Sequence, residues 1–155
     1  MGHLPHNAAP ALASFLKSHF APAFCFLSPE RRRALQVVYA FFRVIDDVVD
    51  EGKQDPAPLI AGWLAAIREK RPSAVREWGH EAFAEKLLSV VERFGVPAFA
   101  LEDFLTGGVT MDLGETRFET AMDTERYCYG VAGTVGIACL PIFGCLLYTS
   151  PSPRD

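Results

Sequence analysis

The sequence has no long run of Lys or Arg residues, and its 155 residues carry a net charge of -4. Proteins that bind nucleic acids present a clustered basic surface, so the missing basic run argues against that class of partner. The first six residues also lack the basic region followed by an apolar run that a secretory signal requires. We therefore expect a cytoplasmic protein that does not bind nucleic acid.

Closely spaced cysteine pairs are missing as well. The four cysteines show no CxxC spacing and lie in apolar sequence: Cys25, Cys128, Cys139 and Cys145. This pattern argues against a disulfide framework and is typical of reduced thiols that pack as small apolar side chains. His80 likewise has no second His or Cys at ligand spacing, so we expect a surface residue and not a metal ligand.

No stretch of convincing length alternates apolar and polar residues as a half-buried strand would. Apolar residues recur instead at helical spacing, and Gly and Pro residues separate the segments. Ser28 and Pro29 suit the start of a central helix, residues 74–94 are predicted as one helix, and Thr120 can cap a later one. The sequence predicts a single all-α domain.

The central helix carries an unusual set of charges in residues 39–50. This apolar segment contains three carboxylates, and those of Asp46, Asp47 and Asp50 share one helix face because they are three or four positions apart. Like charges repel there, and the helix dipole disfavours anions near a C-terminus. Mg²⁺ would offset the charge, and Arg43 suits a phosphate oxygen. The alternative is a solvated, charged helix end.

Several blocks in a fixed order resemble the squalene/phytoene synthase family, whose members join two prenyl diphosphates head to head. The blocks span most of the chain: Phe20-Ala21-Pro22-Ala23-Phe24, Pro29-Glu30-Arg31-Arg32-Arg33-Ala34, Tyr39-Ala40-Phe41-Phe42-Arg43 with the aspartates, Met111-Asp112-Leu113, and residues 127–136. The resemblance implies the N-terminal half of an isoprenoid-synthase-type helical bundle.

The resemblance also implies roles for the acidic stretch. Asp46 and Asp50 are implied to bind Mg²⁺ and diphosphate, with Asp47 as a third metal candidate. Arg43 and Tyr39 are implied to lie near the phosphates, which makes Asp46, Asp50 and Arg43 candidate catalytic residues.

Further substrate contacts follow from the other blocks. Phe20 and Val131 are implied to contact substrate, and Tyr127, a fourth candidate catalytic residue, to steady a diphosphate or a carbocation. Asp112 is implied to belong to the active site without being a metal ligand. The residues alone leave alternatives open: a helix cap for Asp112 and a core tyrosine for Tyr127.

Residues 131–147 contain no charge and are interrupted by Gly and Pro. Their length is near the lower limit for a membrane span, and we interpret them as a buried core helix. Peripheral association with a membrane stays open because the implied substrates and products are apolar. Residues 113–118 look more like bacterial presqualene diphosphate or squalene-type enzymes, and NADPH would be needed only if the full-length enzyme makes squalene.

Two other functions fit parts of the sequence. The aspartates also match DDxxD, the motif of head-to-tail prenyl elongases and terpene cyclases, although residues 127–136 argue against that class. The second alternative is a non-catalytic helical protein, associated with a membrane or a partner, whose aspartates are only a charged helix end.

The end of the chain has a different character. Residues 145–155 look like a translated sequencing-library adapter, so we assign residues 1–144 to a partial isoprenoid synthase domain and the rest to a non-native tail. The alternative is a genuine Pro-rich tail. After Gly136 the only acidic residue is Asp155, so the family's second aspartate-rich segment is missing. We expect the 155-residue chain itself to be inactive.

Long-read sequencing of the source DNA through the codon for Gly144 tests the tail assignment. We expect the frame to continue into helices that bear a second Asp-rich pair. A genome that encodes residues 145–155 and then a stop codon would contradict the adapter assignment and favour the non-catalytic alternative.

Overall fold

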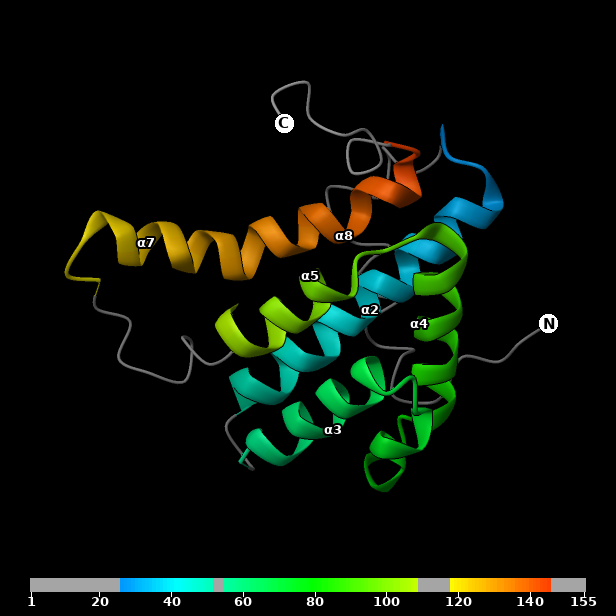
Figure 1. Ribbon diagram of the computed structural model, residues 1–155, viewed down its shortest axis with the longest axis horizontal. Helices are drawn as coiled ribbons and strands as arrows, with labels where there is room; N and C mark the ends of the chain where they lie inside the picture. The colour runs from blue at the N-terminus through cyan, green and yellow to red at the C-terminus, as the bar shows by residue number, and fades with distance from the viewer. Residues whose placement is uncertain (1–25, 52–54, 109–117, 146–155) are drawn as a thin grey trace.

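The computed structural model describes residues 26–51, 55–108 and 118–145, and every regular element in these ranges is helical (Figure 1). The elements in chain order are α2 Pro29–Glu51, α3 Ala57–Arg68, the 3₁₀ helix η2 Pro72–Trp78, α4 Glu81–Phe94, α5 Ala98–Asp103, the π-helix η3 Phe104–Gly108, α7 Ala121–Cys128, the π-helix η4 Tyr129–Gly133 and α8 Thr134–Phe143. The all-α prediction is confirmed for the part of the chain that the structure describes.

Helix α2 runs through the middle of the molecule and begins where the sequence predicts (Figure 1). Ser28 Oγ accepts a hydrogen bond from the backbone N–H of Arg31 at 3.4 Å, and Pro29 occupies the first helical position. Its apolar side is fully buried against α4 and α8, with Val38 and Phe41 at 0% exposure. This burial makes α2 the centre of the core.

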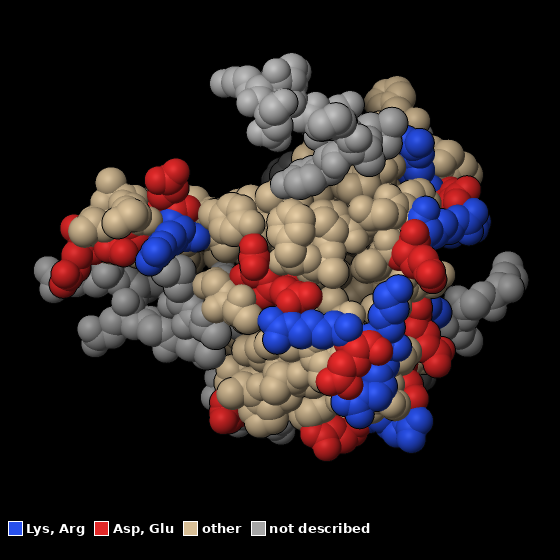
Figure 2. Space-filling view, in the orientation of Figure 1, with Lys and Arg blue, Asp and Glu red and all other residues tan. Residues whose placement is uncertain are grey.

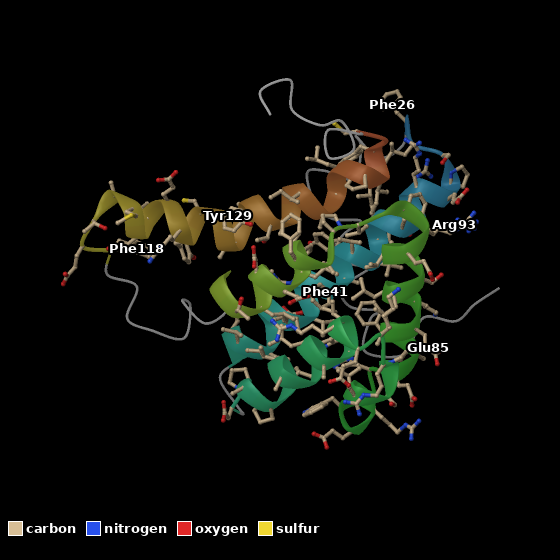
Figure 3. All side chains as sticks on the ribbon, in the orientation of Figure 1. Phe26, Phe41, Glu85, Arg93, Phe118 and Tyr129 are labelled. Carbon is tan, nitrogen blue, oxygen red and sulfur yellow. The ribbon has the colours of Figure 1, made fainter. Side chains whose placement is uncertain are left out.

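Aromatic rings join α2 to its neighbours. The Phe41 ring lies 5.2 Å from that of Trp63 in α3, and the Phe42 ring lies 4.6 Å from that of Phe104 at the start of η3. Trp63 in turn packs edge-on against Phe83 of α4 at 5.7 Å. Edge-to-face pairs of this kind add about 0.5–1.5 kcal/mol beyond the area they bury. Phe41 therefore lies among side chains from several helices (Figure 3).

The prediction of one helix over residues 74–94 is wrong. The chain forms η2 and then α4, separated at Gly79, whose φ of +74° lies in the left-handed region that favours glycine. Across this turn Arg76 donates two hydrogen bonds to the Glu81 carboxylate, at 2.6 and 2.7 Å, and these bonds lower the pKa of Glu81. The helical spacing on both sides of Gly79 hid the break.

The surface assignment of His80 is also wrong. His80 precedes α4 and is only 7% exposed, with its ring centroid 5.9 Å from that of Trp63. Burial disfavours the charged imidazolium and lowers the pKa of His80 below its ordinary value of 6.5. Its neutral ring therefore belongs to the aromatic core.

Helices α7, η4 and α8 follow one another directly and form a rod, Ala121–Phe143, hereafter the α7–α8 rod. Thr120 begins it with a capping box, because its hydroxyl accepts from the Asp123 N–H while the Asp123 carboxylate accepts from the Thr120 N–H. This confirms the predicted cap. The α8 part packs on α2 and α5, whereas α7 extends beyond the other helices (Figure 1).

The prediction that residues 131–147 form a buried helix is wrong. The helix ends at Phe143, where Gly144 takes a φ of +86°, and only 22% of the rod's most apolar 18-residue stretch is buried. Buried residues recur every fourth position, at Gly130, Thr134, Ala138 and Ile142, so one side alone is packed. By length and composition alone the rod could cross a membrane, a criterion that core helices of soluble proteins also meet.

The described cysteines are free thiols, as predicted. Cys139 packs against the core, and burial raises the pKa of its thiol to about 11. Cys128 is exposed, which corrects the expectation of apolar surroundings for that residue. Cys25 lies outside the described residues.

The buried imidazole of His80 predicts a pH-dependent stability. Because the folded-state pKa lies below 6.5, its contribution to stability is fully present above that pH and is lost as the pH falls toward the folded-state pKa. Urea unfolding of the wild type and of His80→Gln between pH 7.5 and 5 measures this effect. We expect the wild type to lose more of its unfolding free energy than the variant, and parallel pH profiles would contradict the assignment.

Candidate active site

One face of α2 gathers the polar residues that the sequence singled out. Four polar residues are spaced at intervals of four, three and four positions, which places them along a single helix face: Tyr39, Arg43, Asp46 and Asp50. The first three are half-buried and Asp50 is exposed, whereas the apolar face of the same helix lies in the core. We call these four residues, together with Asp47, the polar stripe.

Arg43 is already engaged within the stripe. Its Nη2 lies 2.6 Å from Asp47 Oδ1, and the two side chains are 40% and 42% exposed. An exposed pair of this spacing contributes only about 0.3–0.5 kcal/mol, so a phosphate oxygen could displace the carboxylate at little cost. The ion pair therefore keeps the Arg43 guanidinium on the stripe, and a phosphate could replace Asp47 as its partner.

Three carboxylates of α2 do not by themselves enclose a metal ion. Within the described ranges, no group of three or more His, Cys, Asp and Glu side chains is placed to hold one. Asp47 pairs with Arg43, while Asp46 and Asp50 are an i,i+4 pair of carboxylates on the same helix face. That donor set fits Mg²⁺, which usually binds one or two carboxylates and completes its shell with water and substrate phosphates.

The remaining predicted residues lie elsewhere. Tyr127 in α7 and Val131 in η4 are half-buried on the α7–α8 rod, where α7 and η4 pack mainly on η3 and on each other. The Tyr127 ring lies 5.0 Å from that of Phe118, beside the start of α7 (Figure 3). Phe20 and Asp112 lie outside the described residues. The structure thus unites the α2 residues and leaves Tyr127 and Val131 on a separate helix.

Sequence reasoning missed a polar contact near Tyr127. Tyr129 Oη donates a hydrogen bond to Asp103 Oδ2 at 2.8 Å, joining η4 to the end of α5. A pocket of about 370 Å³ opens beside this pair and is also lined by Thr106 and Arg126. The partners are 26 positions apart, so no local spacing could reveal the contact.

Charged side chains away from the stripe mix both signs. They gather over α3 and α4, whereas the face of α8 in the same view is uncharged (Figure 2). Ion pairs join Arg93 to Glu30 between α4 and α2, and Arg68 to Glu102 between α3 and α5. On the face drawn in Figure 2, basic and acidic side chains of the described residues therefore alternate.

Comparisons with known proteins place these features in a family. The family model for squalene/phytoene synthase matches residues 17–148. The chain is 37% identical over 138 residues to a phytoene synthase of Thermus thermophilus, covering 86% of the chain and 45% of that protein. It is 35% identical over 132 residues to a 15-cis-phytoene synthase of Enterobacter agglomerans, covering 81% and 44%. A chloroplastic phytoene synthase of Narcissus pseudonarcissus is 31% identical over 123 residues, covering 76% and 27%.

The chain spans less than half the length of these relatives. All three are named phytoene synthases, and the squalene-type product suggested by residues 113–118 stays a prediction. The match includes α2 with its polar stripe and the whole α7–α8 rod. The resemblance read from the sequence is confirmed, and the chain belongs to the squalene/phytoene synthase family.

Proposed function

We propose that the full-length protein condenses two prenyl diphosphates, of farnesyl or geranylgeranyl length, head to head through a cyclopropyl intermediate. The observation that carries the proposal is the polar stripe itself, which lies on a helix otherwise packed in the core and falls inside the family match. Carboxylates and a guanidinium held along one rigid helix face suit the binding of a metal-complexed diphosphate.

The chain's own groups would bind and orient the leaving diphosphate. Asp46 and Asp50 would hold Mg²⁺, which supplies the positive charge that stabilises the departing diphosphate. Arg43 would exchange its bond to Asp47 for one to a phosphate oxygen, and Tyr39 lies one turn away on the same face. The described carboxylates fit this role through their oxygen donors and their i,i+4 spacing.

The prenyl chains need a different environment. Loss of diphosphate leaves an allylic cation, whose capture by water must be prevented for a carbon–carbon bond to form with the second prenyl chain. Tyr127 and Val131 would contribute to an apolar wall, with the electron-rich ring of Tyr127 facing positive charge. Phe20 and Asp112 complete the proposed substrate contacts. NADPH would enter only if the product is squalene.

The same reasoning limits what the 155-residue chain can do. Its proposed metal ligands all lie on α2, and only 22% of the rod's most apolar 18-residue stretch is fully buried among the described residues. A single pair of carboxylates gives half of the expected metal site, and a helix with few fully buried residues gives limited protection of a cation from water. The proposed location is the cytoplasm, with peripheral contact to the membrane where apolar substrates and products dissolve.

A second candidate function rests on the spacing of the aspartates. Asp46, Asp47 and Asp50 fit DDxxD, so a head-to-tail elongase or a terpene cyclase would use the same first step of diphosphate ionisation. The product separates the classes, because head-to-head condensation joins two prenyl diphosphates into a cyclopropyl diphosphate or a compound derived from it, an elongase gives a longer linear prenyl diphosphate, and a cyclase converts one prenyl diphosphate. The non-catalytic alternative predicts no prenyl product.

Replacing Asp46 and Asp50 together by Asn should abolish the proposed Mg²⁺-dependent reaction. In the full-length protein we expect kcat/KM to fall by at least about 100-fold, because the leaving diphosphate loses its charge stabilisation. Steady-state assays with farnesyl and geranylgeranyl diphosphate across Mg²⁺ concentrations measure the effect. Glu92→Gln removes an exposed carboxylate on α4 and serves as the matched control. Unchanged activity or Mg²⁺ dependence in the double variant would contradict the role proposed for the two aspartates, and absence of any prenyl product from the wild type would favour the non-catalytic alternative.

The 155-residue chain alone should show no turnover. Incubation with farnesyl diphosphate and Mg²⁺, followed by extraction and chromatography of apolar products, tests this. We expect neither a cyclopropyl diphosphate nor a hydrocarbon product, because the described carboxylates supply only part of a metal site. Robust turnover by this chain would show that it contains the whole catalytic apparatus.

A further inference from the structure

Two π-helical turns face each other beside the rod. η3, Phe104–Gly108, directly follows α5, and η4, Tyr129–Gly133, directly follows α7. The two turns are in contact. π-helical turns are rare and recur at functional sites, where the wider turn re-aims the side chains around it. A contact that fixes both turns would therefore control the side chains on each.

The Asp103–Tyr129 hydrogen bond lies at the start of both turns. Asp103 is the last residue of α5 and immediately precedes η3, while Tyr129 is the first residue of η4. The bond from Tyr129 Oη to Asp103 Oδ2 measures 2.8 Å. In Figure 3 the labelled Tyr129 lies where the rod passes α5. One hydrogen bond thus joins the residue that precedes η3 to the first residue of η4.

The Tyr129 ring also lies close to the backbone of η4. A Cβ placed on Gly133 would come within 3.0 Å of Tyr129 Cδ2, so the ring lies directly over this glycine. Glu102, next to Asp103, pairs with Arg68 of α3 at 2.7 Å and so joins α5 to α3.

Stability alone does not account for this contact. Tyr129 is 43% exposed, and a hydrogen bond in contact with water contributes little net free energy to folding. What the bond adds is a point of attachment between the rod and the end of α5, at Tyr129. Tyr127 lies two positions before Tyr129, and Val131 lies two positions after it. Because Tyr127 and Val131 are four positions apart, they share one helix face, while Tyr129 projects toward the opposite side. Anchoring Tyr129 to α5 therefore sets where Tyr127 and Val131 face.

We propose that Asp103 and Tyr129 form a positioning pair that holds Tyr127 and Val131 in the orientation needed for prenyl transfer. The inference rests on the proposed function for its effect on the reaction, and on the two π turns for its structural part. Neither residue of the pair touches the substrate; each acts through the helix that carries Tyr127.

Three variants of the full-length protein test the pair. Tyr129→Phe removes only the hydroxyl, Asp103→Ala removes the acceptor, and Asp103→Asn keeps an oxygen that can accept the bond. Arg68→Gln breaks the other polar link of α5 and is the matched control. We expect Tyr129→Phe and Asp103→Ala to lower kcat by about 10- to 100-fold with little change in KM, because the reacting groups are misplaced while the substrate still binds. Asp103→Asn and Arg68→Gln should stay near the wild type.

Hydrogen exchange on the same proteins separates the pair from the reaction. We expect faster exchange of the amides in residues 104–108 and 129–133 in Tyr129→Phe and Asp103→Ala, with α3 and α4 unchanged. Unchanged kcat in Tyr129→Phe, failure of Asp103→Asn to preserve activity, or uniformly faster exchange would each overturn the proposal. An inactive wild-type protein would defeat the proposed function, and the local exchange would still decide whether the pair holds the two turns.

Discussion

The burial of α2 is the constraint on which the rest of the described structure depends. Its Phe41 and Phe42 pack on rings from α3 and η3, and further aromatic contacts extend this core to α4. Large, rigid rings in edge-to-face contact leave the helix few alternative rotations about its axis. The polar stripe is consequently presented on a fixed side, although none of its residues contributes much to the core. The same packing places His80 against Trp63 and makes the stability of this region sensitive to protonation.

Two weak surface contacts orient side chains that the core does not bury. The Arg43–Asp47 pair and the Asp103–Tyr129 hydrogen bond are both partly exposed and add little to stability. Their value lies in orientation, since the first aligns a guanidinium along the stripe and the second joins two π turns. A strong pair would hold Arg43 away from a diphosphate, whereas a weak one can be exchanged for a ligand. The proposed chemistry therefore relies on a rigid helix that carries exchangeable side-chain contacts.

The α7–α8 rod shows the limit of reasoning from hydropathy. Residues 131–143 of the rod carry no charge and indicated a buried helix, yet among them only Thr134, Ala138 and Ile142 are fully buried within the described part of the chain. Hydropathy reports how readily a residue would be buried, and not whether a partner is present to bury it. The helical break at Gly79 was missed for a related reason, because apolar spacing continued on both sides of a single left-handed residue.

The sequence by itself determined the helical class, the start of α2 at Ser28 and Pro29, the cap at Thr120 and the family, because these depend on local spacing and on ordered motifs. It also placed the aspartates of α2 on one face, since helical periodicity is a local property. Only the tertiary structure decided that Asp47 turns toward Arg43, that His80 is buried and that Tyr129 meets Asp103. The last two depend on residues distant in the chain, and the first on a choice among rotamers, none of which local spacing specifies.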